Sequence, residues 1–337
     1  MKAPSLPYQA SATACVDARP DEAPVNRRFE CDDVDAHARC MTGWSIHLDQ
    51  LSPGPFHGML HEIHVDGVQL LRERVNRALL KRGDASQHTT SFSVPLETAG
   101  AGYCAGTPLQ ERMLLVSSGT SLPELRTPDQ HDVAVLTVSS DALRAVASLD
   151  DGDTALPLSE AACLVALSGP RYDTLKTFLL ESFGAAETVG EAFDHPQMRK
   201  ALHDAVLLEL AHIVEHAQDP VRLDRTARHR IVARVRELVI AKPDVPFTVL
   251  DICHAVGTSR RKLQYCFEET LGTHPAHYLR VLRLNAVRRE LRRHSHGAAS
   301  VSDVAFRWGF WHLSRFATHY RQLFGELPSE TLKRPPQ

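Results

Sequence analysis

Short apolar runs alternate with polar turn residues from Trp44 to about Ser139. Runs such as GMLHEIHV, TTSFSVPL and HDVAVLTV are separated by glycine, proline and aspartate, which is typical of antiparallel strands. This pattern predicts a β-rich unit, either cupin-like or another small barrel. Beyond Asp150, apolar residues recur three and four positions apart in LSEAACLVALSG, PRYDTLKTFLLESFG and PQMRKALHDAVLLELAHIVEHAQ, which predicts helices flanking the strands.

The last third of the chain contains two similar stretches, TVLDICHAVGTSRRKLQYCFEETLGTHP and SVSDVAFRWGFWHLSRFATHYRQLFGELP. Each begins with a hydroxyl residue that is followed three positions later by an aspartate: Thr248 with Asp251, and Ser300 with Asp303. This capping box satisfies backbone amides at the start of a helix. The two stretches therefore predict two helices that begin in the same way.

Each of these short helices is predicted to end at a glycine, Gly257 or Gly309, because glycine suits the left-handed backbone of a tight turn. A second helix follows each turn, with apolar residues four positions apart. These residues are Leu263, Phe267 and Leu271 in the first copy and Phe316, Tyr320 and Phe324 in the second. A short helix, a tight turn and a second helix form a helix-turn-helix unit, so the sequence predicts two such units.

The segment between the two copies, from Pro275 to about His294, is rich in Arg, Leu and Val and predicts one long helix. Some nineteen residues at about 1.5 Å each span roughly 28 Å, close to the ~34 Å between successive major-groove faces of a DNA duplex. One chain with a groove-reading unit at each end of a stiff helix can therefore contact two consecutive turns of DNA.

Residues off the apolar stripes of the two second helices are expected to face outward. Arg and Gln can read guanine and adenine edges in a major groove, while Ser and Thr can contact bases or phosphates. The outward residues predicted to read bases are Arg260, Arg261, Gln264 and Tyr265 in the first copy, and Ser314, Arg315 and Thr318 in the second. The residues predicted to contact DNA phosphates are Ser259, Lys262, Arg283, His319 and Arg321.

Charge is distributed very unevenly along the chain. Residues 1–221 contain 17 Lys and Arg against 31 Asp and Glu, a net −14, whereas residues 222–337 contain 21 against 10, a net +11. A strongly basic part favours a polyanion as its partner, although a merely solvated helical surface would also be basic. The change in charge falls within the polar segment QDPVRLDRTAR, residues 218–228, which we predict to be a domain linker.

Residues 229–334 resemble the DNA-binding domain of AraC/XylS-type transcription regulators. The resemblance lies in DVAF followed by WGF, in SRF followed by YRQLFG, and in a proline near the end, all within residues 303–328. It implies base contacts by the positions predicted above other than Arg260, and it adds Ala317, which has only a methyl group to offer, for instance to thymine. The segments TVLDIC, SRRKLQ, RLNAVRREL and LSPGPFHG are similar to regulators of ethanolamine operons.

The resemblance implies a regulator, with activation expected, that responds to a small-molecule effector. Ethanolamine is a candidate effector, together with adenosylcobalamin. Double-stranded promoter DNA and RNA polymerase are the implied macromolecular partners, and the flanking helices are candidates for a homodimer contact. The expected organisation is a mobile N-terminal arm over residues 1–40, an effector-binding and dimerisation domain over 41–217, the linker over 218–228 and a double helix-turn-helix domain over 229–334.

Two other functions were weighed from the residues. HIVEH places His212 and His216 one helical turn apart with Glu215 between them, a pattern used by one class of zinc peptidase. Ordinary packing of an amphipathic helix explains the same residues, so a metal-dependent hydrolase stays the alternative from another class. A constitutive DNA-binding protein without an effector is the other alternative. No reaction is predicted.

The sequence contains few signals for a metal or effector site in the β-unit or for the location of the protein in the cell. Metal binding by His57, His61 and His64 was considered, but alternation along a strand would separate His64 from the other two. Aromatic residues in the β-unit are core residues or line an effector pocket; they are Trp44, Phe56, Phe92 and Tyr103. No apolar run approaches the roughly 18 to 20 residues of a membrane span, so we predict a cytoplasmic protein without a membrane partner.

Overall fold

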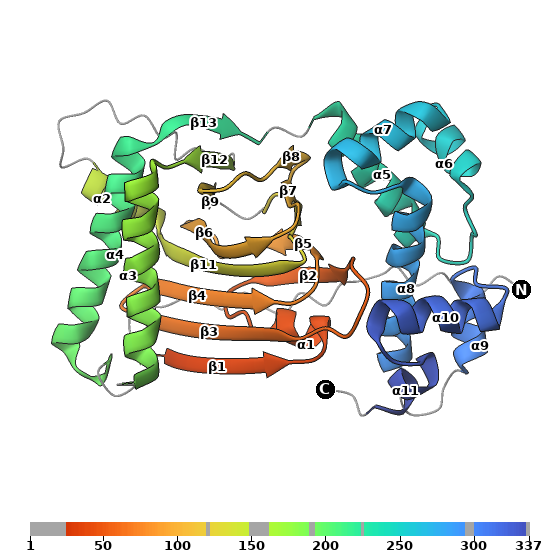
Figure 1. Cartoon of the computed structure of the whole chain (residues 1–337), viewed down its shortest axis with the longest axis horizontal. Coiled ribbons are helices and arrows are strands. Elements are labelled where there is room, and N and C mark those ends of the chain that lie inside the picture. The colour runs from red at the N-terminus through yellow and green to blue at the C-terminus, as the bar shows by residue number, and fades with distance from the viewer. Residues whose placement is uncertain are drawn as a thin grey trace, which may run out of the picture.

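The computed structural model describes residues 25–118, 122–147, 162–188, 193–223, 226–293 and 300–334. A β-rich N-terminal part is flanked on one side by two long helices and on the other by a helical C-terminal part (Figure 1). No helix in these ranges is long and apolar enough to cross a membrane. The combination of a β-rich unit and a helical unit confirms the coarse fold that the hydrophobic pattern predicts.

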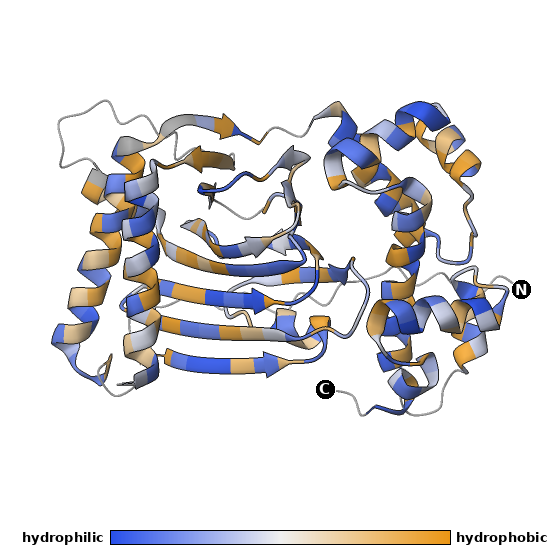
Figure 2. Cartoon of the chain, in the orientation of Figure 1, coloured by the Kyte–Doolittle hydropathy of each residue, from blue (hydrophilic) through white to orange (hydrophobic). Residues whose placement is uncertain are grey.

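Two antiparallel sheets form the N-terminal part. The first has the order β1 (Val25–Cys31), β3 (Gly58–Val65), β4 (Val68–Val75), β11 (Gln130–Ser139), β6 (Thr89–Ala99), β9 (Met113–Ser118), β12 (Cys163–Ala166) and β13 (Gln218–Arg222). The second has the order β2 (Ser45–Gln50), β5 (Leu79–Asp84), β10 (Leu125–Arg126), β7 (Tyr103–Cys104) and β8 (Thr107–Pro108). Hydrophilic and hydrophobic residues are interspersed along β1, β3 and β4, as expected for strands with two different faces (Figure 2).

Four helices accompany the sheets: α1 (Val34–Arg39), α2 (Ser140–Ala147), α3 (Gly169–Thr188) and α4 (Pro196–His216). The largest apolar core joins α2, α3 and α4 to the first sheet. Phe92 and Leu136 come from the strands, and Phe183 and Leu210 from the helices. Two of the three amphipathic helices predicted after Asp150, now α3 and α4, thus bury their apolar faces on the first sheet.

Three expectations about this part differ from the structure. Residues 163–166, expected to be helical, form β12 between β9 and β13, because a short continuous apolar run fits a buried strand as well as a helix. Residues 25–40 form β1 and α1 instead of belonging to an arm, since β1 pairs with β3 along its whole length. Residues 218–222, expected to be linker, pair with β12. The rest of the predicted arm, residues 1–24, lies outside the described residues.

The C-terminal part consists of α5 (Ala227–Ala241), α6 (Val249–Val256), α7 (Arg260–Leu271), α8 (Pro275–Arg293), α9 (Val301–Arg307), α10 (Leu313–Phe324) and α11 (Pro328–Lys333). One apolar core holds α5, α6 and α7 against the first half of α8, with Phe267 and Tyr278 in edge contact. A second core holds α9 and α10 against the second half of α8 through Val287, Phe316 and Tyr320. The long helix α8 therefore joins two separate helix clusters (Figure 1).

Candidate nucleic-acid interface

Both predicted helix starts have the same geometry. Thr248 Oγ1 accepts from the Asp251 amide at 3.2 Å, and Asp251 accepts in return from the Thr248 amide at 2.8 Å. Ser300 and Asp303 repeat the arrangement, each backbone amide lying 3.2 Å from the other residue's side chain. In both pairs the capping hydrogen bonds hold the pKa of the aspartate below its usual value. The local sequence signal therefore sets both helix starts.

The turns that follow also match. Gly257 and Gly309 have φ of 67° and 78°, in the left-handed region that disfavours other residues. A Cβ on Gly257 would meet nothing within 4 Å, whereas one on Gly309 would lie 3.1 Å from Pro246 Cβ. At Gly257, the positive φ alone favours glycine. At Gly309, the close approach of Pro246 disfavours a larger residue in addition to the positive φ.

The four base-reading candidates of α7 are all exposed: Arg260, Arg261, Gln264 and Tyr265. Along the helix, Arg261 Nη2 lies 3.3 Å from Tyr265 Oη, and Gln264 donates to Glu268 Oε1 at 3.0 Å. Tyr265 is 47% exposed, although it is a large apolar side chain. Leu263, Cys266 and Phe267 face the core. The side of α7 opposite its core therefore carries donors, and two of them, Arg261 and Gln264, bond neighbours on the same helix.

On α10, Ser314, Arg315 and Thr318 are exposed, while Ala317 is half-buried. Thr318 Oγ1 donates to the Ser314 carbonyl at 3.0 Å. Phe316 and Tyr320, four positions apart, are buried in the second core. The outward positions predicted for α10 thus lie outward as well, with Ala317 close to the boundary of the exposed face.

Three of the phosphate-contact candidates are exposed, and two are half-buried. Lys262 and Arg321 are exposed. Ser259 is exposed as well, and its side chain caps α7 by accepting from the Lys262 amide at 3.2 Å. Arg283 is half-buried and donates to the Phe247 carbonyl at 2.9 Å. His319 is half-buried, and burial together with Arg280 and Arg315 holds its pKa below the usual value. Arg283 is thus engaged within the domain, in contrast to Lys262 and Arg321.

Arg280 is a further cationic residue that the sequence analysis did not single out. It is exposed on α8, between the two helix clusters, and its charge lowers the pKa of both His277 and His319. A helical wheel of α8 would have placed Arg280 on the polar side, but only the fold brings it near α10. It extends the cationic surface from α7 along α8 toward α10.

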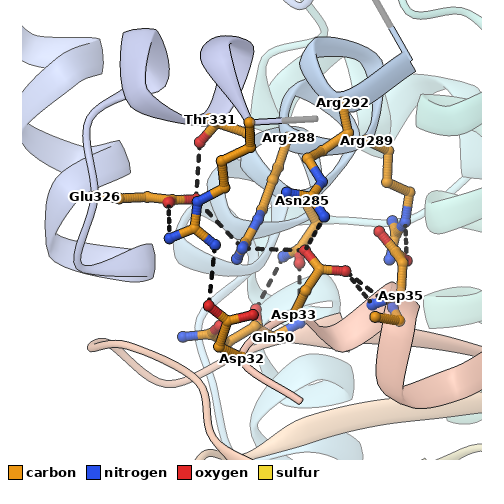
Figure 3. Close-up of polar contacts among 12 residues, drawn as sticks. Asp32, Asp33, Asp35, Gln50, Asn285, Arg288, Arg289, Arg292, Glu326 and Thr331 are labelled. Atoms are coloured by element: carbon orange, nitrogen blue, oxygen red, sulfur yellow. Dashed lines mark hydrogen bonds and ion pairs between the residues drawn. The ribbon is translucent and has the colours of Figure 1, made fainter. Parts of the chain in front are cut away.

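The N-terminal part contacts α8 through a buried polar cluster (Figure 3). Arg288 is 3% exposed and lies between Asp33 Oδ2 at 3.1 Å and Glu326 Oε1 at 3.3 Å. Next to it, Arg289 binds Asp35 at 2.8 Å and Asp49 at 2.7 Å. Part of the charge difference between the two parts of the chain is therefore used in their contact with each other.

Further contacts connect the second sheet and its loops to both helix clusters. Arg126 donates to the Leu271 carbonyl at the end of α7, and Arg236 of α5 pairs with Glu124. At the other cluster, Gln50 donates to the Leu323 carbonyl at 2.6 Å, and the Gly54 amide donates to the same carbonyl at 3.0 Å. The N-terminal part thus bridges the two clusters on a side that leaves the outward faces of α7 and α10 exposed.

The residues behind the alternative hypotheses lie in the N-terminal part. His212 and Glu215 are half-buried on α4, and the side chain of His216 lies outside the described residues. His61 is buried and bonds Asn26 at 2.8 Å, while His57 is exposed. Within the described ranges, no group of three or more His, Cys, Asp or Glu side chains is placed to hold a metal ion. Of the aromatic residues suggested for a pocket, Trp44 lines a cavity, whereas Phe56 and Phe92 belong to apolar cores.

Comparison with known proteins assigns the C-terminal part. A family model described as a helix-turn-helix domain matches residues 252–334. The probable thc operon regulatory protein of Rhodococcus erythropolis is 39% identical over 106 residues, covering 32% of each chain. The XylDLEGF operon transcriptional activator of Pseudomonas putida is 44% identical over 75 residues, covering 22% of this chain and 23% of its own.

A solved AraC-type DNA-binding domain-containing regulator of Chromobacterium violaceum is 31% identical and covers 31% of this chain and 89% of that one, with a TM-score of 0.28. Residues 252–334 therefore match a helix-turn-helix domain and are similar in sequence to parts of these regulators. The two curated relatives are named as an operon regulatory protein and an operon transcriptional activator. The chain spans about a quarter to a third of the length of the curated relatives it matches.

Proposed function

We propose that the protein is a sequence-specific DNA-binding transcription regulator in which the pairs α6–α7 and α9–α10 act as two helix-turn-helix units. The observation that carries this proposal is the exposure of polar and cationic side chains on α7 and α10, at the two ends of α8. Helix α8 has 19 residues and is thus about 28 Å long, which suits two consecutive major-groove faces of one duplex.

Roles follow for the individual residues. We assign base reading to Arg260, Arg261, Gln264 and Tyr265 of α7 and to Ser314, Arg315, Ala317 and Thr318 of α10. Phosphate contacts are assigned to Ser259, Lys262, His319 and Arg321, with Arg280 added. Arg283 is the weakest of the phosphate candidates because its guanidinium already binds the Phe247 carbonyl. A phosphate beside His319 would favour its protonated form and so add a charge when DNA binds.

We assign residues 25–223 to a regulatory domain, cupin-like in the sense of a small two-sheet β-unit, and residues 226–334 to the DNA-binding domain. Activation through RNA polymerase and formation of a homodimer belong to the same proposal. The helices α3 and α4 carry exposed Leu180, Met198 and Leu208, which are candidates for a dimer contact. The alternative, a constitutive DNA-binding protein without an effector, would show no change in thermal stability with any small-molecule ligand.

Ethanolamine with adenosylcobalamin remains a predicted effector pair. It is tested by the thermal unfolding midpoint of the full chain with each compound and with both, because a ligand that binds only the folded state raises that midpoint. An increase with both compounds together would support the ethanolamine hypothesis. No change at millimolar concentrations would exclude it and leave the DNA-binding proposal untouched.

The DNA-binding proposal is tested by selecting binding sites from random duplexes with the full chain. We expect one enriched motif made of two blocks, and an affinity that falls steeply as salt rises, since Lys and Arg release counterions from phosphates. The paired variants Gln264→Ala and Arg315→Ala should each relax one block only. Enrichment of no motif, or identical behaviour of both variants on every sequence, would contradict the proposal.

A further inference from the structure

The N-terminal domain encloses a cavity between its two sheets. It comprises about 860 Å³ of empty space, which includes open solvent at its mouth. Its wall is mainly apolar, and its largest members are Met41, Trp44, Ile46, Leu71, Met113 and Leu115. An apolar body of at least one ring or a short alkyl chain fits such a lining.

Polar groups gather at one corner of this cavity. Glu73 is 2% exposed and has both carboxylate oxygens engaged, one with Lys81 and the other with His37 Nε2 at 3.0 Å. Lys81 has three ammonium donors, and Glu73 is its one partner among the described residues. His131 also lines the cavity, and its buried Nδ1 has no hydrogen-bond partner. The spare donors at this corner are those of the Lys81 ammonium, and the unpaired His131 Nδ1 adds one more in one tautomer of the ring, so Lys81 favours a ligand with an anionic acceptor group.

Strand β5 separates this corner from the DNA-binding domain. Lys81 faces the cavity, while its neighbour Leu80 packs in the core formed by α5, α6, α7 and α8. Arg82 lines the cavity and also donates to Asp49 Oδ2 at 2.6 Å. Asp49 Oδ1 in turn accepts from Arg289 of α8 at 2.7 Å. A change at Lys81 is therefore one residue away from Leu80, which packs against the DNA-binding domain, and from Arg82, which is linked to that domain through Asp49.

We propose that this cavity binds an amphipathic monocarboxylate, with its carboxylate at Lys81 and its apolar body against Trp44 and Met113. We further propose that β5 transmits its presence to α8 through Arg82, Asp49 and Arg289. The regulatory half rests on the proposed DNA-binding function. Binding to Lys81 competes with Glu73 and shifts β5, so the ligand distinguishes two positions of Arg82, which is what a coupling between sites requires.

Ligand binding is tested on the full chain by titration calorimetry with 4-phenylbutanoate, 4-phenylbutan-1-ol and 4-phenylbutylamine, which share one apolar body. We expect the carboxylate alone to bind measurably. The double variant Lys81→Met/Glu73→Gln removes the buried ion pair without leaving one charge unpaired, and it should abolish binding. Lys200→Met, at an exposed position of α4, is the matched control and should bind as the unaltered chain does.

Equal or tighter binding of the alcohol or the amine would overturn the assigned ligand class. Absence of binding by all three compounds, or unchanged binding in the double variant, would overturn the site. None of these outcomes depends on DNA, so a chain that failed to bind DNA would refute the proposed function while this half of the inference stood.

Coupling is tested by the affinity for a selected DNA site with and without saturating 4-phenylbutanoate. We expect a change of about fivefold or more in the unaltered chain. Arg289→Met, outside the cavity lining, should still bind the carboxylate but lose most of this change, while the control Arg74→Met, also outside the lining, should retain it. A full effect in Arg289→Met, or none in the unaltered chain, would overturn the proposed route.

Discussion

The side chain of Asn285 is paired with the backbone of Gln50 in both directions, across 235 positions of the sequence. The Gln50 amide donates to Asn285 Oδ1 at 2.9 Å, and Asn285 Nδ2 donates to the Gln50 carbonyl at 2.9 Å. Both residues are buried: Gln50 is 0% exposed and Asn285 is 2% exposed. The side chain of α8 thus completes the edge of β2, as a neighbouring strand would do.

Asn285→Ala should destabilise the chain because it leaves a buried amide and a buried carbonyl of Gln50 without partners. Unsatisfied buried groups cost about 1 to 3 kcal/mol each, so for two groups we expect a loss of roughly 2 to 6 kcal/mol in urea unfolding. Asn76→Ala is the matched control, since Asn76 also bonds backbone in both directions but at an exposed site. Equal losses in the two variants would show that burial of the Asn285 pair is not decisive.

Arg289→Met should weaken the domain contact and increase sensitivity to acid. Burial alone would raise the pKa of Asp49, but Arg289 and Arg82 hold it well below the usual value. A carboxyl with a lowered pKa stabilises the fold above the unfolded value of about 3.9 and loses that contribution as pH falls. Removing Arg289 should cost about 3 kcal/mol at neutral pH.

In the same variant, the pKa of Asp49 should rise, so that acid unfolding begins at a higher pH. Circular dichroism along a pH titration measures this shift. Arg144→Met provides a comparison at an exposed ion pair and should change stability by less than about 0.5 kcal/mol. An unchanged acid transition in Arg289→Met would refute the importance of the Arg289 and Asp49 pair.

His131 should make the fold less stable as pH falls from 6.5 to about 4. Burial, with the nearby charge of Lys81, lowers its pKa from 6.5 to about 4, although Glu73 and Asp132 act in the opposite direction. In this window the unfolded chain takes up a proton that the folded chain does not, at a cost of roughly 3 kcal/mol over the whole range.

The variant His131→Gln should remove that dependence. Denaturant unfolding of both chains at several pH values between 6.5 and 4 measures their free energies of unfolding. As pH falls through this range, the unaltered chain should lose stability relative to the variant. Parallel curves for the two chains would show that His131 does not titrate in this way.

Lys262→Ala and Gln264→Ala should differ in how they change DNA affinity, although both residues are exposed on α7. Loss of a phosphate contact should weaken all sequences alike and reduce the salt slope by about one. Loss of a base contact should cost about 1 to 3 kcal/mol on the preferred sequence and little on others. Fluorescence anisotropy at several salt concentrations distinguishes them, and a uniform loss in Gln264→Ala would contradict its assigned role.

Local signals made the helical C-terminal part predictable. Thr248 and Ser300 start their helices through bonds to residues three positions away, and the turn at Gly257 depends on its own φ, so a short window contains all that is needed. The outward positions of α7 and α10 followed from the period of the buried residues. The same kind of signal was ambiguous for Cys163–Ala166, where only pairing with β9 and β13 decides for a strand.

Long-range relations could not be predicted in this way. Arg288 and Arg289 belong to the basic part of the chain that the charge pattern marks as a partner for a polyanion, but their partners Asp33, Asp35 and Asp49 lie about 240 to 255 positions earlier in the chain. No periodicity links such residues, because their proximity results from the packing of two domains. The cavity is non-local for the same reason, since its wall combines strands of both sheets.

Base-substitution interference on a selected site, compared for Gln264→Ala and Arg315→Ala, tests most directly whether α7 and α10 read one face of a duplex. The two variants should each lose sensitivity at a separate block of base pairs, with block centres about 10 base pairs apart. Loss at the same block in both variants, or blocks about half a turn apart on opposite faces of the duplex, would contradict the arrangement proposed for α7, α8 and α10.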